Sequence, residues 1–461
     1  MHEPSKDSLP PAARPSPPAA STEARPSLVR RIIPVDRGEW RAVILSALYF
    51  FFILLSYYLL RPVREVMAIK RGYDDLPWLM TGTLVAMAGA NPLFSWLVAR
   101  YPRRIFIPAT YRFFAFNMLV FLGLFYARKV VTLPENWEVW LGYAFYIWLS
   151  VFNLFVVSVF WGFSADIYRR EQAIRLFGLI AIGGTIGAIS GATITGWFVK
   201  SLEVPIPVML AIAILPLELA VQCVKALLRW QAREGAAAGP GGAVAPREPG
   251  PGMWKGLELL GRSSYLMLIA LYMLLFTISS TFLYMEQARI VAETFASDAD
   301  RAAAFARIDT WTNVLTLTTQ FFLTGQAMRL LGVGGTLCML PVVTIAGFAA
   351  LWYNPTFAVL QWFQVFRRGL HYAVDRPARE TLYTVLGSDE KYKSKSFIDT
   401  FVYRAGDMIG GWTPKWVAPL GIAVPWLAIP VGAMWLTVAV VLGIKQRQKA
   451  RLAKGQAAAI T

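Results

Sequence analysis

The stretch ALYFFFILLSYYLLRPVREV, from Ala47 to Val66, decides the fold class, because it is a long apolar run that ends in a group of charges. About 20 apolar residues are enough for an α-helix to cross a hydrocarbon core of about 30 Å. Arg61, Arg64 and Glu65 then follow within little more than one turn. Such charges are either anchors at the membrane surface or part of a polar site inside the protein.

The composition of the whole chain agrees with a membrane protein. Of the 461 residues, 56% are hydrophobic and only 16% are charged, whereas soluble domains have about 45–50% apolar and about 25% charged residues. The strands of a β-barrel would be shorter and would alternate in polarity. We therefore predict an all-α membrane protein with twelve transmembrane helices. The predicted spans are residues 42–60, 77–98, 105–127, 138–163, 176–199, 205–228, 264–285, 309–331, 335–353, 356–374, 397–420 and 424–444.

The charge distribution predicts the orientation of the chain. The net charge is +17, and most Lys and Arg residues fall in the termini and in the loops on one side of the predicted spans. This is the bias of cytoplasmic segments, so we predict a multi-pass protein of the cell inner (plasma) membrane with both termini cytoplasmic and no nucleic-acid partner. Cys223 and Cys338 both lie inside predicted spans, which argues against a disulfide framework or a metal cluster.

The domain organisation follows from the longest polar interruption, QAREGAAAGPGGAVAPREPGPGMWKG, Gln231 to Gly256. Its Gly, Pro and Ala content is typical of a flexible linker, with six predicted spans before it and six after. Major facilitator transporters are built in this way, with the substrate site between the two halves near the middle of the membrane. The predicted units are a disordered cytoplasmic tail (1–40), an N-terminal six-helix bundle (41–230), the linker (231–257), a C-terminal six-helix bundle (258–445) and a basic cytoplasmic tail (446–461).

Regularly spaced glycines mark the fifth predicted span, GLIAIGGTIGAISGATITG, Gly178 to Gly196. A dinucleotide-binding loop would require a preceding strand and a following acidic residue, and neither is present. In an apolar helix, small residues at every fourth position allow a second helix to approach closely. We predict close helix packing at Gly183, Gly187 and Gly191.

Polar side chains recur on one face of the first, eighth, tenth and eleventh predicted spans. An ionisable residue in hydrocarbon costs at least about 2.5–3.5 kcal/mol, so such residues usually face the bundle interior or a water-filled cavity. Arginine forks suit phosphate and carboxylate groups, so we predict a central path for an organic anion. Its predicted substrate-binding residues are Tyr57, Arg61, Arg64, Asp309, Asn313, Gln364, Arg368, His371, Tyr403, Arg404 and Asp407.

Other pairings of the same charges stay open at this stage. Arg61 and Glu65, four residues apart, can neutralise each other on one helix, as can Arg404 and Asp407. Arg112 in the third span can pair with Glu218 or with a backbone carbonyl. His371 is either an interior histidine or a proton carrier, and Arg367 can point at a neighbouring helix.

No catalytic chemistry is expected. With only two histidines, one of them His2 in the tail, the chain offers no metal-binding Glu-x-x-His and no Ser-His-Asp set. It also lacks a G-x-x-x-x-G-K-[ST] motif for ATP hydrolysis, so transport must use solute or ion gradients. We expect no enzyme activity and no cofactor.

The stretch NLFVVSVFWGFSADIYRREQAIRLFGLIAIGGTIGAISG, Asn153 to Gly191, resembles the fourth-to-fifth helix signature of the ATP/ADP antiporter (nucleotide transporter) family of bacteria and plastids. YLLRPVREV (58–66) and KYKSKSFIDTFVYRAGDMIGGW (391–412) are similar to the end of that family's first helix and to its eleventh helix. The resemblance covers essentially all predicted spans. It implies a fold like that of the major facilitator superfamily and counter-exchange of nucleotides.

Four positions, in three helices, differ from the members that exchange ATP for ADP. Arg64 and Glu65 replace a lysine and an aspartate, Leu149 stands where those members have a functional glutamate, and Asp407 stands where they have a functional lysine. The first change preserves charge, and the last reverses it in a place where a phosphate would feel it.

The leading hypothesis is a secondary transporter that binds a phosphate-bearing anion with Arg61, Arg64, Arg368 and Arg404, while Asp309 and Asp407 complete the site or bias gating. Its only predicted partners are membrane lipid and this small solute. The alternatives are a proton-coupled facilitator for a different solute, with His371 or Asp309 titrating, and a non-transporting scaffold or sensor. A second predicted group gates the cytoplasmic side. It consists of Arg100, Arg103 and Arg104, in a stretch that resembles the short helix-linking loop of facilitators, together with Asp166, Arg170, Glu171 and Arg175.

Overall fold

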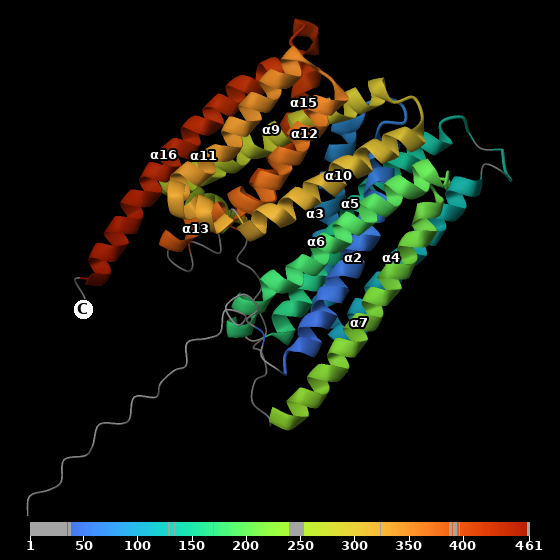
Figure 1. Cartoon of the computed structure of the whole chain (residues 1–461), viewed down its shortest axis with the longest axis horizontal. Helices are drawn as coiled ribbons and strands as arrows, with labels where there is room; N and C mark the ends of the chain where they lie inside the picture. The colour runs from blue at the N-terminus through green and yellow to red at the C-terminus, as the bar shows by residue number, and fades with distance from the viewer. Residues whose placement is uncertain are drawn as a thin grey trace, which may run out of the picture.

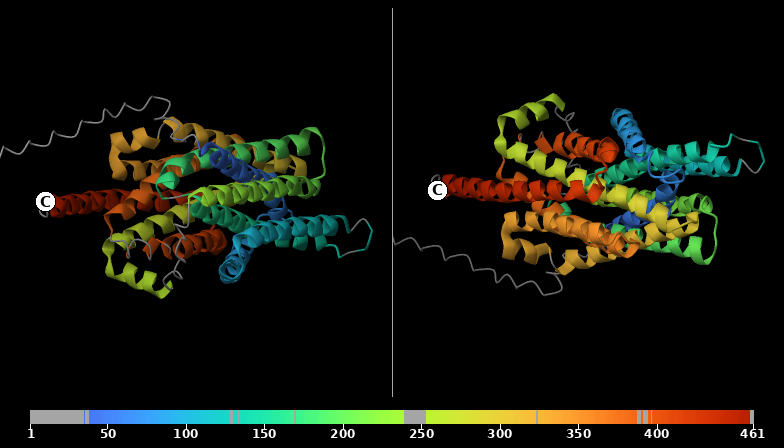
Figure 2. Two further views of the ribbon diagram at one scale, coloured as in Figure 1. Left: turned by 90° about the horizontal axis from the view of Figure 1, so that it is seen from below. Right: turned by 90° about the horizontal axis from the view of Figure 1, so that it is seen from above.

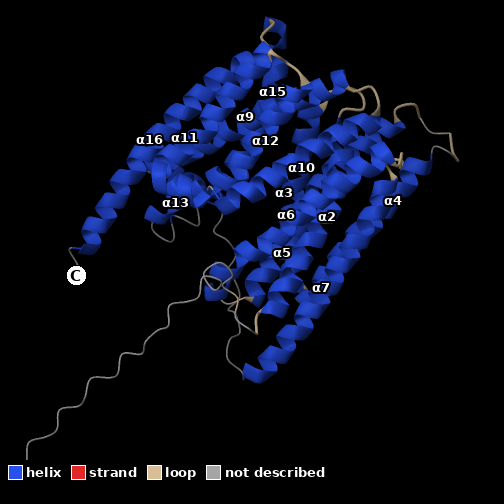
Figure 3. Cartoon of the chain, viewed as in Figure 1, coloured by secondary structure: helices blue, strands red, loops and turns tan. Residues whose placement is uncertain are grey.

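The computed structural model of the chain is built from α-helices, with no β-strand in the residues that it describes. These residues are 35, 38–127, 130–132, 134–168, 170–238, 253–322, 324–386, 390, 394–395 and 397–458. The all-α prediction is confirmed (Figure 3). The long helices are α2 (Trp40–Ala68), α3 (Leu76–Arg100), α4 (Arg103–Ala127), α5 (Trp137–Ile167), α6 (Arg170–Ser201), α7 (Val208–Ala238), α9 (Ser264–Thr294), α10 (Asp298–Phe322), α11 (Thr324–Tyr353) and α16 (Val424–Ala458).

Shorter helices complete the C-terminal part of the chain. They include α8 (Met253–Arg262), α12 (Phe357–Leu370), α13 (Arg376–Leu382) and α15 (Tyr403–Val417). A π-helical turn joins α12 to α13 at His371–Asp375, and a second one, Ile398–Val402, precedes α15. π-turns inside helices are rare and are frequent at functional sites.

The helices form two groups, one from each half of the chain. In the N-terminal group α2 packs on α5, α6 and α7, and in the C-terminal group α9 and α11 pack on α16. The groups meet where α10 lies against α6 and α2 and where α15 lies against α3. They diverge towards the lower left of Figure 1, where α7 and α16 end, and their helices run roughly side by side in both views of Figure 2.

Eight helices in the described part of the chain are long and apolar enough to cross a membrane. They are Trp40–Ala68, Arg103–Ala127, Trp137–Ile167, Arg175–Ser201, Val208–Arg233, Ser264–Thr294, Met328–Tyr353 and Val424–Leu452. In α3 only Leu76–Ala90 is apolar enough, and α10, α12 and α15 carry polar residues along one face. The chain is therefore a multi-pass membrane protein.

Several predicted boundaries are wrong because helices continue through polar sequence. The linker was predicted from residue 231, but α7 extends to Ala238 and α8 begins at Met253, while residues 239–252 lie outside the described part. The tail was predicted from residue 446, but α16 runs to Ala458. The eighth predicted span, 309–331, is also misplaced, since α10 covers Asp298–Phe322 and α11 follows from Thr324. Of the predicted tail 1–40, only Val35 and residues 38–40 are described.

The glycines of α6 form its contact with α2. A Cβ atom built on Gly183 or Gly187 would collide with the carbonyl oxygen of Ala47 or Phe51, and one on Gly191 would lie 2.7 Å from the carbonyl oxygen of Leu55. The contacted residues of α2 are four apart, so the two backbones touch along successive turns. The prediction of close packing is confirmed, and this contact fixes α2, which carries Arg61 and Arg64.

We expect Gly187→Ala to lower the stability of the protein, because the added methyl group meets the backbone of α2 rather than a movable side chain. Overpacking of this kind costs about 1–3 kcal/mol. Gly178→Ala on the same helix is the matched control, since nothing lies within 4 Å of its added Cβ. Thermal unfolding of the two purified variants measures the difference, and equal melting temperatures would show that the α2–α6 contact tolerates the methyl group.

Candidate functional site

A polar cavity of about 310 Å³ lies between the two groups of helices. Its wall comes from α2, α3 and α5 on one side and from α9, α10, α12 and α15 on the other. Five arginines and three carboxylates line it: Arg61, Arg64, Arg367, Arg368 and Arg404, with Glu65, Asp309 and Asp407. Positive groups thus outnumber negative ones in a chamber that both halves of the chain build.

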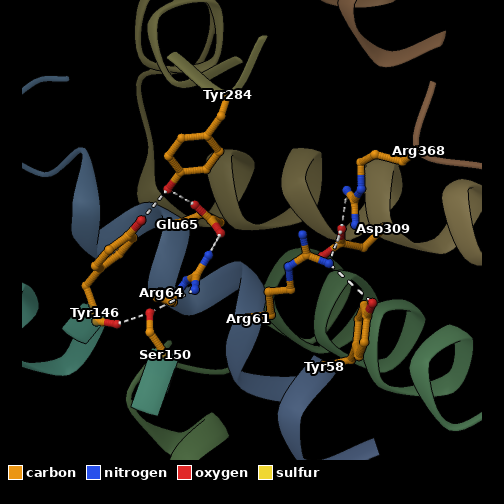
Figure 4. A network of polar contacts seen from close by, with 9 residues as sticks. All are labelled: Tyr58, Arg61, Arg64, Glu65, Tyr146, Ser150, Tyr284, Asp309 and Arg368. Atoms are coloured by element: carbon orange, nitrogen blue, oxygen red, sulfur yellow. Dashed lines mark hydrogen bonds and ion pairs between the residues drawn. The ribbon is translucent and has the colours of Figure 1, made fainter. Parts of the chain in front are cut away.

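The first charge network crosses between the halves at Asp309 of α10 (Figure 4). Asp309 Oδ1 lies 3.1 Å from Arg61 Nη1 and 2.8 Å from Arg368 Nη1, so two guanidinium groups share one carboxylate oxygen. Arg61 also donates a hydrogen bond of 3.3 Å to the Tyr58 hydroxyl. The Asp309 side chain is only 4% exposed. Arg61 therefore pairs with a residue of the other half rather than with Glu65 on its own helix.

The second network also joins the halves, through Glu65 of α2. Arg64 Nη2 donates to Glu65 Oε1 at 2.5 Å, and the Tyr284 hydroxyl of α9 donates to Glu65 Oε2 at 2.6 Å. The hydroxyl groups of Tyr146 and Tyr284 lie 3.1 Å apart (Figure 4). Arg64 also donates to Ser150 Oγ at 3.2 Å and lies over the Tyr146 ring.

Unfilled hydrogen-bond donors remain in both networks. Arg61 Nε, Arg64 Nε and Arg368 Nη2 are buried and have no hydrogen-bond partner among the residues that the structure describes. A buried donor that is left unpaired costs about 1–3 kcal/mol, and more when it is charged. Guanidinium groups with spare donors beside a cavity are suited to receive an anion.

The C-terminal group supplies the remaining charged wall. Arg404 Nη1 lies 3.2 Å from Asp407 Oδ2, and Thr281 Oγ1 donates to the other carboxylate oxygen at 3.2 Å. The pairing of Arg404 with Asp407 along one helix is thus confirmed, and both residues still line the cavity. Arg367 donates to Ser280 Oγ of α9 and Thr344 Oγ1 of α11, so it links neighbouring helices as well as lining the chamber.

The structure places nine of the eleven predicted substrate-binding residues in the cavity wall: Arg61, Arg64, Asp309, Gln364, Arg368, His371, Tyr403, Arg404 and Asp407. Tyr57 is outside it, buried with its ring edge-on to Tyr58. Asn313 is also outside it, because its amide donates to the backbone carbonyl of Asp309 one turn earlier. Both residues adjoin the first network, and their role in substrate binding stays a prediction.

Several wall residues escaped the sequence analysis. Tyr146, Ser150 and Tyr284 come from α5 and α9, which read as uniformly apolar helices. The only sequence signal for these residues is a single hydroxyl group within an otherwise apolar helix. Asp375, the last residue of the π-turn, accepts a hydrogen bond from the Tyr272 hydroxyl and contacts His371 Nδ1.

The predicted cytoplasmic gating residues pack at the ends of the N-terminal helices. Arg103 Nη2 lies 2.7 Å from Asp166 Oδ2, and Arg175 donates to both carboxylate oxygens of Glu39. Arg100 lies over the Trp96 ring, and Arg104 is exposed. The side chains of Arg170 and Glu171 lie outside the described part of the chain. A latch between the halves on this side stays a prediction.

Contacts between the halves gather at the opposite end of the helices. Lys200 Nζ of α6 lies 3.0 Å from Asp300 Oδ1 of α10. Trp412 of α15 donates from Nε1 to Thr81 Oγ1 of α3, and its ring packs edge-on against Trp78. The halves are therefore in contact at this end and apart at the end where α7 and α16 terminate (Figure 1).

Comparison of the sequence with known proteins finds relatives that are membrane carriers. No family model matches the chain. Its alignment with ADP,ATP carrier protein 1 of Chlamydia trachomatis is 470 positions long and shows 22% identity. This alignment covers 88% of this chain and 89% of that protein. The chain is 23% identical to the chloroplastic ADP,ATP carrier protein 1 of Arabidopsis thaliana, over 80% of this chain and 67% of that protein. The chain is a relative of the ADP,ATP carrier proteins.

The fold agrees with this relationship to the ADP,ATP carriers. A solved structure of a bacterial homologue of the human lysosomal transporter Spinster, in an inward-facing and unoccupied conformation, matches 90% of this chain with a TM-score of 0.50 and 13% identity. The sequence relatives confirm the resemblance to the ATP/ADP antiporter family, and these relatives are carriers rather than enzymes, as expected.

The positions that depart from the ATP/ADP exchangers have different surroundings. Leu149 is fully buried in the core of the N-terminal group and is not part of the cavity wall. Asp407 does line the cavity, and its charge is balanced by Arg404. Of these two substitutions, only the one at Asp407 changes the charge that a solute in the chamber meets.

Proposed function

We propose that the chain is a secondary active transporter that exchanges nucleotides, or closely related phosphate-bearing anions, across the cell inner (plasma) membrane by alternating access. It crosses the membrane twelve times in two six-helix bundles of the major facilitator type. α2 to α7 form the first bundle. In the second, α12 with α13 forms the tenth span, and the π-turn with α15 forms the eleventh. Both termini are cytoplasmic.

The observation that carries the proposal is the arginine-rich chamber shared by the two halves. Phosphate groups bind guanidinium forks in a bidentate way, and spare donors remain on Arg61, Arg64 and Arg368. Tyr146, Tyr284 and Phe276 also line the cavity and offer flat faces for a nucleobase. The carrier relatives, named for ADP and ATP, support the nucleotide class.

The same contacts suggest how binding is linked to movement. Arg61 and Glu65 belong to one half, and their partners Asp309 and Tyr284 belong to the other. A phosphate that binds Arg61 and Arg368 competes with Asp309 for them, and so weakens the contact that joins the halves in the empty protein. The contacts that we assign to the outer end, such as Lys200–Asp300, close the chamber to the outside.

We expect ATP and ADP to raise the melting temperature of the purified protein, and inorganic phosphate to do so only at much higher concentration. A ligand at 100 times its Kd stabilises the folded protein by about 2.7 kcal/mol. The measurement is thermal unfolding in detergent or nanodiscs, with AMP and a dicarboxylate as comparison ligands. The anion model fails if none of these compounds shifts the transition.

Flux measurements in proteoliposomes then separate exchange from the alternatives. Labelled ADP uptake that requires internal nucleotide and does not respond to a pH gradient supports counter-exchange. Uptake into empty liposomes that follows a pH gradient supports the proton-coupled alternative, in which His371 beside Asp375 carries the proton. Ligand binding without any flux supports the sensor alternative.

A further inference from the structure

An ion pair lies on the outer surface of the N-terminal group, within the membrane-spanning part of the chain. Arg112 of α4 and Glu218 of α7 form a bidentate pair, with Nη2 to Oε1 at 2.8 Å and Nε to Oε2 at 3.2 Å. Gln222, one turn further along α7, donates to Glu218 Oε1 at 2.5 Å. The side chains of Arg112 and Glu218 remain 53% and 39% exposed. We call Arg112, Glu218 and Gln222 the outer polar patch.

The patch lies deep in the membrane rather than at its surface. Glu218 is ten residues from the first residue of α7, Val208, which is about 15 Å at 1.5 Å per residue and therefore near the middle of the bilayer. Arg112 is nine residues from the start of α4, Arg103. Charged groups at such depth are costly and normally face protein or a water-filled cavity. The central chamber is elsewhere, because neither residue is among its lining.

We propose that the outer polar patch is the centre of a contact with a second copy of this chain, related by a twofold axis. A twofold interface brings the same surface of both copies together, so that surface must complement itself. A patch made of one arginine and one glutamate side by side meets this condition, because the rotation places each arginine beside the glutamate of the other copy. The four charges then form a closed ring shielded from lipid.

The surroundings of the patch suit such a contact. Phe113 and Phe116 of α4 and Leu215 of α7 are 61%, 63% and 66% exposed on the same faces. They provide an apolar rim that excludes water and lipid head groups from the charges. α4 and α7 form the edge of the molecule that faces away from the C-terminal group (Figure 1). A second copy bound there leaves the C-terminal group free to move.

Charge reversal tests the proposal. Arg112→Glu makes the patch wholly negative and Glu218→Arg makes it wholly positive, so each variant alone repels its own copy. We expect each to reduce the dimer fraction at least tenfold relative to the unchanged protein, as counted by single-molecule photobleaching in liposomes over a range of protein-to-lipid ratios. When the two variants carry different tags and are produced together, they should pair with each other as well as the unchanged chains do.

Two controls separate loss of association from loss of folding. Arg262→Glu reverses one charge of the exposed Arg262–Glu258 pair on α8 and should leave the dimer fraction unchanged. Recovery of pairing in the mixed sample shows that both variants fold, because a misfolded chain would not regain a partner when a second variant is added.

Cysteine cross-linking gives a measurement that needs no charge change. Leu215→Cys, in a chain whose Cys223 and Cys338 are replaced by serine, should cross-link to itself in native membranes, whereas Val440→Cys on the exposed face of α16 should not. The proposal is overturned if the unchanged protein is monomeric at every lipid ratio, or if it is bound one-to-one to a different polypeptide. It is also overturned if the mixed charge-reversal variants fail to pair while each still exchanges solute.

Discussion

Exchange of labelled ADP for internal ATP falls at least 100-fold when Arg61 is replaced by glutamine, while the protein still inserts into the membrane. Glutamine removes the charge that bridges α2 to Asp309 and leaves the carboxylate with Arg368 alone. A loss of 100-fold corresponds to about 2.7 kcal/mol of transition-state stabilisation, which is in the range for removing one partner of a buried charge pair. Uptake into proteoliposomes at equal protein content measures the effect.

Arg61→Lys and Arg262→Gln make the result specific. Lysine keeps the charge but loses the planar fork of the guanidinium group. We therefore expect the exchange activity of Arg61→Lys to lie between that of Arg61→Gln and that of the unchanged protein. Arg262 is exposed on α8 outside the cavity, and its replacement should have no effect. Full exchange by Arg61→Gln would return Arg61 to the role of a membrane anchor and remove the main support for the proposed site.

For Asp309→Asn we expect a different result, namely tighter binding of the nucleotide and slower exchange. Asp309 occupies donors of Arg61 and Arg368 that a phosphate would otherwise use. With a neutral amide in its place, both guanidinium groups attract the anion without competition. We expect the Kd for ATP to decrease about tenfold and the exchange rate to decrease at least tenfold, because release becomes slow. Calorimetry and flux assays on the same preparation measure the two quantities.

The double variant Arg61→Gln, Asp309→Asn tests whether the two residues act as a unit. If the carboxylate acts by competing for Arg61, Asp309→Asn tightens binding less in the Arg61→Gln background than in the unchanged protein, so the two effects do not add. Weaker ATP binding by Asp309→Asn would instead mean that the carboxylate orients Arg61 and Arg368 towards the solute.

The sequence was sufficient to predict which face of each helix lines the cavity. It was not sufficient to predict which charged residues pair across the cavity. Helical spacing put Arg61 and Arg64 on one face of α2, and Gln364 and Arg368 on one face of α12, as the structure has them. Pairing is a tertiary property: Arg61 and Asp309 are far apart in the chain, whereas the expected local partner Glu65 pairs with Arg64 instead.

Neutral wall residues and irregular turns were not readable from the sequence. Tyr284 and Ser150 lie in long apolar helices where a single hydroxyl does not alter the pattern. The π-turn at His371–Asp375 interrupts the regular helical repeat, and no residue pattern in the sequence marks it. Helix ends were missed for a related reason, since α16 and α7 continue as helices after the apolar composition that defines a span has stopped.

The excess of arginines over carboxylates in the chamber has a consequence for energetics across the membrane. Each elementary charge that crosses a potential of 100 mV is worth about 2.3 kcal/mol, and five arginines with three carboxylates give the chamber wall a surplus of positive charge. In the exchange that we propose, ATP and ADP carry different charges, so their movement in opposite directions through this chamber transfers net charge. The membrane voltage therefore favours one direction of exchange, and the cell's electrical state becomes a driving force for the carrier.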